Sequence, residues 1–194
     1  MLRSIMAVGL AGLLLGGCAS VRVAESEVQT FSSLNAMPAH PTFRFERLPS
    51  QQAQDSRQVE VERMAEAALV RAGLNRDDAQ AHYGVQLGVR VVRDDRVDWN
   101  DVWWYGSGMR GWRLGHTGHW PALWMQATPW YQREVSLALR DTTTGQVVYE
   151  TRAVEESTWS DTANLLPAMF SAALAEFPAA TQGVRPRKVA LPLP

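Results

Sequence analysis

The segment HYGVQLGVRVV, residues 82–92, has the clearest strand pattern in the sequence. Every second residue from Tyr83 to Val91 is large and apolar, while the residues between them are mainly glycine or polar. Strict alternation of this kind predicts a strand with one covered face and one face in water. We therefore expect the fold to be built on a sheet with a single covered face.

Three other segments show strand signals. Thr42–Leu48 alternates and is followed by Pro49, which ends it. Glu134–Asp141 and Val147–Glu155 are joined by the sequence TTTG, residues 142–145, which predicts a turn and hence a hairpin.

Two segments repeat apolar residues at three- and four-residue steps, which is typical of amphipathic helices. The first is Asp55–Gly73, where Asp55 and Gln58 have the spacing of a capping box and Gly73 suits a left-handed helix end. We expect its carboxylates on the side that faces water: Glu60, Glu62 and Glu66.

The second helix is expected to begin near Asn164, because proline at position 167 is best tolerated in a first helical turn, and to stop at Pro178. One amphipathic sheet and two amphipathic helices predict an α+β fold in two layers. The sheet is expected to be mostly antiparallel, with four to five strands and both helices packed on one face.

The N-terminus has the pattern of a secretory signal. Arg3 precedes an apolar run, Ile5–Leu15, that is too short to span a bilayer as a helix. Leu15-Gly16-Gly17-Cys18 then resembles the lipobox of bacterial lipoproteins, in which the signal is cut before the cysteine and the cysteine receives lipid. The resemblance implies that Cys18 is the lipidation site, and Ala19 after it favours the outer membrane.

The domain boundaries follow from these signals. We expect a signal peptide at 1–17, a lipidated tether at 18–41, a domain at 42–178 with an insert at 94–131, and a flexible tail at 179–194. Residues 20–28 have a short strand-like pattern within the tether, which is compatible with an added edge strand.

Charge and cysteine content restrict the possible partners. The chain has 19 basic and 20 acidic side chains, and removal of residues 1–17 takes away only Arg3. This balance favours neither nucleic acid nor electrostatic binding to anionic lipid. Cys18 is the only cysteine, so an intramolecular disulfide is impossible.

Residues 94–131 form a long connection that carries seven of the eight tryptophans, interleaved with five glycines. Connections of this length inside compact domains are uncommon and usually functional or disordered. A tryptophan-rich surface can stack on sugars, lie at a lipid headgroup boundary or bind a protein. Alternatively, the tryptophans pack on one another and cover an open end of the sheet. The residues expected to contact a partner are Trp103, Trp104, Tyr105, Trp112, Trp120 and Trp124.

No catalytic, metal or cofactor site is predicted. His116 and His119 lie three residues apart, but no third ligand is identifiable. No serine lies in a G-x-S-x-G motif. The adjacent Glu155 and Glu156 should point to opposite faces of a strand, so they cannot act as a pair.

The order of these features resembles the bacterial envelope lipoproteins called domain of unknown function 4136. The resemblance runs from Phe43 to Pro178 and includes Ala72–Leu74 at a helix end, the strand Val85–Val91 and the hairpin Leu137–Tyr149. Val148-Tyr149-Glu150 departs from the pattern, since a tryptophan would be expected after the apolar pair. The family name implies a fold and an envelope location, and it adds no activity.

Together these features predict a non-catalytic lipoprotein, anchored at the periplasmic face of the outer membrane. It is expected to bind an envelope protein or glycan through the tryptophan-rich insert. The alternatives are a purely structural lipoprotein with a packed tryptophan core and, with less support, an envelope hydrolase. The sequence does not specify an oligomeric state.

Overall fold

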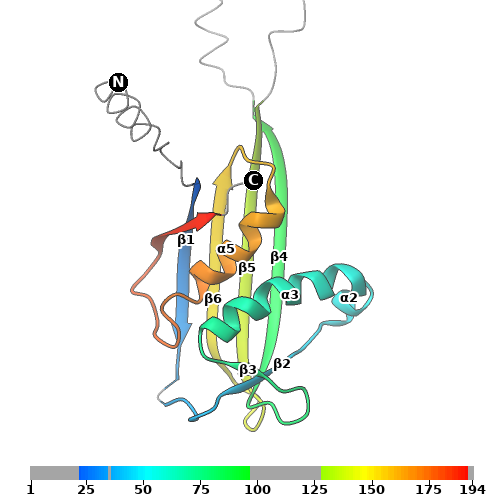
Figure 1. The fold of residues 1–194 in the computed structure, drawn as a ribbon, viewed down its shortest axis with the longest axis vertical. Coiled ribbons are helices and arrows are strands. Elements are labelled where there is room, and N and C mark those ends of the chain that lie inside the picture. Colours follow the sequence, from blue (N-terminus) through cyan, green and yellow to red (C-terminus); the bar gives the residue numbers. More distant parts are fainter. Residues whose placement is uncertain (1–21, 35, 97–127, 192–194) are drawn as a thin grey trace, which may run out of the picture.

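Four long antiparallel strands form the centre of the sheet, and two main helices run across it (Figure 1). The computed structural model describes residues 22–34, 36–96 and 128–191. The strand order is β3-β2-β4-β5-β6-β1-β7. The strands are β1 (Arg22–Ser32), β2 (Thr42–Phe45), β3 (Asn75–Arg76), β4 (Tyr83–Arg96), β5 (Thr128–Asp141), β6 (Val147–Ser157) and β7 (Arg185–Leu191). The helices are α2 (Pro49–Gln52), α3 (Asp55–Arg71) and α5 (Thr162–Ala173).

The fold is α+β, but the expected sheet of four to five mostly antiparallel strands with two helices is wrong. The described residues form a seven-stranded mixed sheet with three helices. The mixed character arises at β2, which pairs in parallel with both β3 and β4. Parallel neighbours need a crossover connection, and α3 lies in the chain between β2 and these two strands.

The segments expected to form a tether and a tail contribute two strands. β1 has eleven residues, pairs with β6 on one side and leaves its other edge available. β7 fills that edge in antiparallel register, from Arg22 opposite Leu191 to Val28 opposite Arg185. Pro186 and three basic residues hide the strand pattern of β7 in the sequence, so its pairing with β1 was not predicted.

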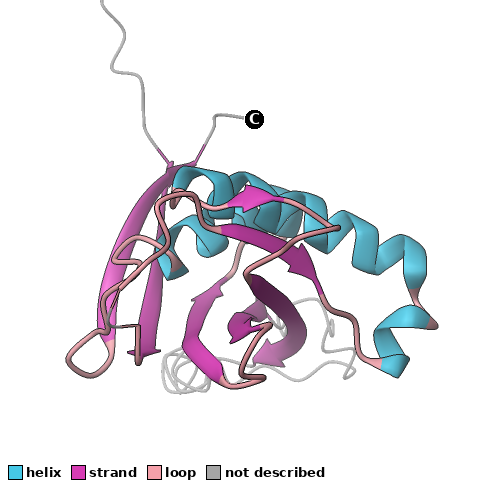
Figure 2. Cartoon of the chain, turned by 90° about the horizontal axis from the view of Figure 1, so that it is seen from below, coloured by secondary structure: helices cyan, strands magenta, loops and turns pink. Residues whose placement is uncertain are grey.

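The helices cover one face of the sheet (Figure 2), and the predicted alternation is confirmed in the strands beneath them. In β4, Tyr83, Val85 and Leu87 are buried, as expected for the covered face. The same face of β5 contributes three fully buried apolar side chains. Burial of these side chains, at about 25 cal/mol per Å² of apolar surface, is the main stabilising term of such a core. The largest core side chains include Phe43, Leu69, Leu137, Leu139, Tyr149, Met169 and Phe170.

Helix ends agree only in part with the sequence pattern. Gly73 has φ +93°, and the Leu74 amide donates to the Leu69 carbonyl at 3.1 Å, so the predicted left-handed end of α3 is confirmed. The predicted capping box is wrong, because Gln54 is the N-cap and makes no side-chain cap bond. α5 begins at Thr162, two residues before the expected start, so Pro167 lies inside the helix.

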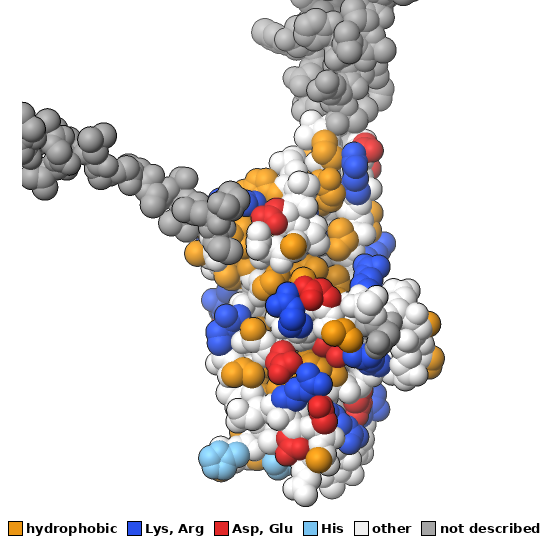
Figure 3. All heavy atoms as spheres, turned by 45° about the vertical axis from the view of Figure 1, so that its right-hand side comes forward, with side chains coloured by type: hydrophobic (Ala, Val, Ile, Leu, Met, Phe, Trp, Pro, Cys, Tyr) orange, Lys and Arg blue, Asp and Glu red, His pale blue; other side chains and the backbone are white. Residues whose placement is uncertain are grey.

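Acidic and basic side chains are interspersed on the surface, and histidines lie at the lower end (Figure 3). On the sheet face away from the helices, Glu46 lies 3.6 Å from Arg44 and 3.7 Å from Arg140. Its carboxylate occupies the space above Gly84, where a β-carbon would collide with it. Within the described ranges, no helix is long and apolar enough to cross a membrane.

Candidate functional site at the insert end of the sheet

The predicted site residues fall outside the part of the chain that the structure describes. These are Cys18 and the aromatic residues Trp103, Trp104, Tyr105, Trp112, Trp120 and Trp124. The borders of the insert are described, because β4 continues to Arg96 and β5 begins at Thr128. The strands therefore extend into the region that the sequence pattern assigned to the insert.

The end of the sheet at Arg96 and Thr128 is called the insert end below. β1 begins there and β6 ends there, because β1, β6, β5 and β4 are successive antiparallel neighbours. β7 also ends there, with Leu191 opposite Arg22. Figure 1 shows the ends of β4 and β5 at the top of the molecule, with the start of β1 and the ends of β6 and β7 in its upper part. The topology thus places the start of the described chain at the same end of the sheet as the borders of the insert, with β6 between β1 and β5.

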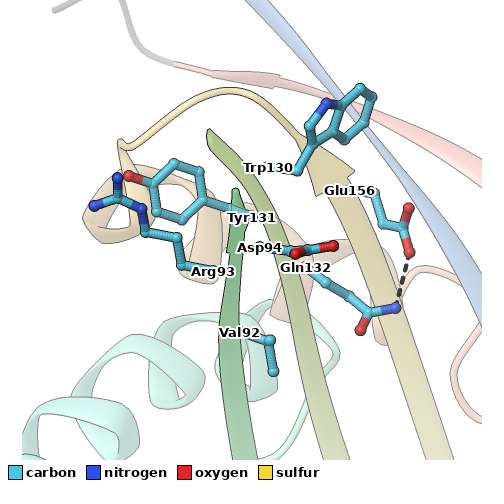
Figure 4. Close-up of a pocket in the computed structure, with 7 residues that line it drawn as sticks. All are labelled: Val92, Arg93, Asp94, Trp130, Tyr131, Gln132 and Glu156. Carbon is cyan, nitrogen blue, oxygen red and sulfur yellow. Dashed lines mark hydrogen bonds between the residues drawn. The ribbon is translucent and has the colours of Figure 1, made fainter. Parts of the chain in front are cut away.

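A hollow of about 200 Å³ lies at the insert end, between β4, β5 and β6 (Figure 4). Strand alternation places five of the lining side chains on the open face of the sheet: one is aromatic, one is aliphatic and three are polar. Gln132 donates from Nε2 to Oε1 of Glu156 at 2.8 Å. Trp130 lies opposite Asp94 in the β4–β5 register. The residues on this side are Val92, Asp94, Trp130, Gln132 and Glu156.

An ion pair buried on the helix side supports the insert end. Arg133 is fully buried, and its Nη1 lies 2.8 Å from Oε2 of Glu155, its register partner in β6. Arg133 also donates from Nε to Oγ1 of Thr162 at 3.0 Å and from Nη2 to the Trp159 carbonyl. The guanidinium carbon lies 4.9 Å from the centre of the Tyr131 ring. One side chain thus joins β5 and β6 to the start of α5.

The first residue of β1 is held against the segment that precedes α5. The guanidinium carbon of Arg22 lies 4.7 Å from the centre of the Trp159 ring, and its Nη1 lies 3.1 Å from Oδ2 of Asp161. Asn164 donates to both carboxylate oxygens of Asp161 at 3.1 Å. The pKa of Asp161 is lowered below its usual value. The hydrogen bond from Asn164 is the largest cause, and the hydrogen bond from Arg22 lowers the pKa further. The carboxylate therefore stays ionised and paired with Arg22.

One prediction about chemistry can be compared with the described residues. Glu155 and Glu156 diverge as expected, since Glu155 binds Arg133 on the helix side while Glu156 accepts from Gln132 on the open side. The described ranges contain no group of three or more histidine, cysteine, aspartate or glutamate side chains able to hold a metal ion. The His116–His119 pair lies outside them.

Sequence reasoning missed the buried pair between Arg133 and Glu155. A signal for it exists, because Arg133 continues the inward positions of Val135 and Leu137, and Glu155 continues those of Thr151 and Ala153. A charged residue at an inward position needs an oppositely charged partner, since an unpaired buried charge is costly. The pairing becomes evident only when the β5–β6 register is known.

The comparison with solved structures matches a PelC dodecamer from Paraburkholderia phytofirmans, 12% identical, with a TM-score of 0.45. The match covers 77% of this chain and 96% of that one. A PDZ domain protein from Parabacteroides distasonis is 13% identical, with a TM-score of 0.47, over 95% of this chain and 42% of that one. Likenesses of this extent identify no activity or partner for this chain.

No curated protein matches the sequence. The family model described as Domain of unknown function (DUF4136) matches residues 28–179, from within β1 to beyond α5. Its range includes both borders of the insert and the buried pair beneath the hollow. The chain therefore belongs to the DUF4136 family.

Proposed function

We propose that this chain is a lipid-anchored, non-catalytic protein of the bacterial envelope that binds an envelope protein or glycan at its insert end. The observation that carries the proposal is the hollow at the base of the insert, where Trp130 lies with two carboxylates and an amide. The lipobox-like sequence before Cys18 supports the anchor, and Ala19 favours the outer membrane, with the domain on the periplasmic side.

The chemistry of the hollow favours a glycan over a protein partner. A tryptophan ring offers an apolar face against the C–H groups of a sugar. Asp94 and Glu156 supply carboxylate acceptors, and Gln132 supplies both a donor and an acceptor for hydroxyl groups. Glycan sites need a few such oriented polar groups beside an aromatic surface, as small-molecule sites do in general. A saccharide unit is therefore the occupant that this set of side chains suits best.

The anchor is tested by replacing Cys18 with serine. Intact-mass measurement of the wild-type protein should show a fragment that starts at Cys18 and carries acyl chains, and Cys18→Ser should abolish that added mass. The Cys18→Ser chain should accumulate as an unlipidated precursor, which lacks the acyl chains whose burial contributes about 0.8 kcal/mol per CH₂ to membrane binding. Ser20→Ala is the control and should remain acylated. Normal acylation of Cys18→Ser would contradict the assignment.

The binding surface is tested by Trp130→Ala in the non-acylated Cys18→Ser chain. Titration with peptidoglycan fragments and with lipopolysaccharide should show binding of at least one glycan. Trp130→Ala should weaken that binding about tenfold or more, since buried tryptophans at binding surfaces commonly contribute over 1.4 kcal/mol. Phe31→Ala, an aromatic truncation on the same sheet face, should leave it unchanged.

Two results would count against a glycan site in the hollow. Equal affinity of Trp130→Ala and the parent chain would exclude the hollow as the contact surface. Absence of binding to every glycan, together with a photo-crosslink from position 132 to an envelope protein in cells, would favour the protein partner. A crosslinker at position 143, at the opposite end of the sheet, is the matched control.

A further inference from the structure

We propose that the outer edge of β4 at Val89 binds an extended peptide of another protein, which pairs with β4 as an added strand. This edge is separate from the insert end, since Val89 lies five residues along β4 from Asp94, about 16 Å at the rise of a strand. Peptide binding there neither requires nor prevents the binding of a glycan at the insert end.

β4 has a strand beside it along only part of its outer edge. β2 pairs with β4 from Tyr83 to Val85, and within the described ranges no strand follows along the rest of this edge. Glu46 donates its N–H to the Val85 carbonyl at 2.8 Å, so the backbone groups of Val85 point to the outer edge. The backbone groups of alternate residues in a strand point the same way, so those of Leu87 and Val89 do so as well.

A side-chain amide takes the place of a neighbouring strand beside Leu87. Gln51 in α2 donates from Nε2 to the Leu87 carbonyl at 2.6 Å, and its Oε1 accepts from the Leu48 N–H at 2.8 Å. The Gln51 amide thus hydrogen-bonds β4 as a peptide group would. Val89 is the next residue whose backbone N–H and C=O point to this edge.

A hollow of about 190 Å³ lies beside Val89, next to α2 and the start of α3, and is called the edge hollow below. Figure 1 shows α2 and the start of α3 at the side of β4. Val61 and Val89 form the apolar wall of the edge hollow. It is smaller than the pockets of about 300–1,000 Å³ that hold drug-sized ligands, so it suits one side chain of a bound strand. Its polar lining comes from Ser50, Gln51, Gln54, Arg57 and Gln58.

The edge hollow contains a side-chain amide that lacks a hydrogen-bond partner among the described residues. Gln58 is 8% exposed, and no described residue forms a hydrogen bond with its side-chain amide. Every solvent-inaccessible side-chain nitrogen or oxygen in the described ranges has a partner, so the Gln58 amide is reached through the hollow that it lines. An amide of this kind can donate to a peptide carbonyl and accept from a peptide N–H. A bound peptide would supply the hydrogen bonds that this nearly buried amide lacks.

The groups at this edge suit a peptide backbone better than a sugar. Exposed strand edges bind extended peptides through main-chain hydrogen bonds, and adjacent pockets accept alternate side chains of the peptide. The described lining of the edge hollow has two valines and no aromatic ring, so it offers an aliphatic side chain a contact surface but gives a sugar no ring to stack on. Arg57 is exposed at the mouth and adds a positive charge, which favours an acidic residue in the peptide.

The site is tested with a phage-displayed library of random linear heptapeptides, screened against the non-acylated Cys18→Ser chain. At least one peptide should be enriched, and a synthetic copy should bind Gln58→Leu about tenfold or more weakly, because its hydrogen bonds to the amide are lost. Gln80→Leu makes the same change at an exposed glutamine outside the edge hollow and should leave the affinity unchanged.

Strand pairing also has a signature that other modes of binding lack. Methylation of the backbone nitrogens of alternate residues blocks one edge of an extended peptide. One of the two alternate sets should therefore abolish binding, while the other should leave it nearly unchanged. Amide hydrogen exchange at Val89 should become slower in the complex.

Four results would overturn the peptide site: no enriched peptide, equal affinity of Gln58→Leu and the parent chain, equal losses in Gln58→Leu and Gln80→Leu, or a methylation series without this asymmetry. A peptide whose binding is weakened by Trp130→Ala instead of Gln58→Leu would belong to the insert end and would also overturn it. Glycan titration of Gln58→Leu should match that of the parent chain, so the failure of either site is distinguishable from the failure of the other.

Discussion

Replacement of Glu155 by alanine is expected to lower the free energy of unfolding by about 3–5 kcal/mol, the usual cost of breaking a buried ion pair. The substitution removes the carboxylate 2.8 Å from Arg133 and leaves a guanidinium that is fully buried. An unpaired charge in such a position has a much higher free energy than the same charge in water. The substitution therefore destabilises the folded state relative to the unfolded state. Urea unfolding followed by circular dichroism measures the effect as a lower midpoint.

A matched control lies on the opposite face of the same two strands. Glu134 and Arg152 form an ion pair at 2.7 Å whose arginine is largely exposed. Glu134→Ala should cost about 0–1 kcal/mol, because water screens exposed pairs. Equal losses from Glu155→Ala and Glu134→Ala would contradict the argument.

A double substitution separates pairing from packing. Arg133→Met together with Glu155→Leu removes both charges and keeps apolar volume in the core. Such replacements of buried pairs are often neutral or stabilising, so the double variant should regain most of the stability lost in Glu155→Ala. The hydrogen bonds from Arg133 to Thr162 and to the Trp159 carbonyl are lost as well. The segment before α5 should therefore show faster amide hydrogen exchange in the double variant.

Phe170→Ala is expected to destabilise the domain by about 3–5 kcal/mol, the range for truncation of a buried aromatic residue. Phe170 lies in α5, is fully buried and belongs to the main core cluster between the helices and the sheet. The substitution removes apolar contacts and leaves a cavity that a packed interior closes only in part. Thermal or urea unfolding should show the loss without a change of fold.

Phe31→Ala is the control for this prediction, because it makes the same chemical change at a side chain that is 60% exposed. It should change the free energy of unfolding by about 0.5 kcal/mol or less, as surface substitutions commonly do. A similar loss in both variants would mean that the Phe170 side chain is not part of the core. A larger loss in Phe31→Ala would mean that the open face is covered near β1.

The elements that were predicted correctly have local patterns. The alternation from Tyr83 to Val91 identifies β4 and its covered face, and the apolar spacing between Asp55 and Gly73 identifies α3. Such periodicity follows from backbone geometry, which repeats every two residues in a strand and every 3.6 in a helix. It also identifies the hairpin of β5 and β6 through the turn at residues 142–145.

The errors involve contacts between distant segments. Glu62 was expected to face water, but it is 5% exposed and accepts from Nε and Nη2 of Arg47 at 2.6 and 2.8 Å. β7 has no strong pattern of its own and forms a strand because β1 presents an unpaired edge. The candidate hollow also needs β6, since Glu156 meets Gln132 only through the β5–β6 register.

The sequence alone identifies the amphipathic strands and helices, the tryptophan-rich insert and the lipobox-like motif before Cys18. Each of these features is a pattern within a single continuous stretch of the chain. The parallel pairing of β2, the addition of β7 and the Arg133–Glu155 pair depend on which segments meet in space. So does the gathering of Arg22, Trp130 and Trp159 at one end of the sheet. The entropic cost of closing a loop rises only slowly with its length, so strands far apart in the sequence can pair, and local patterns do not show which of them do.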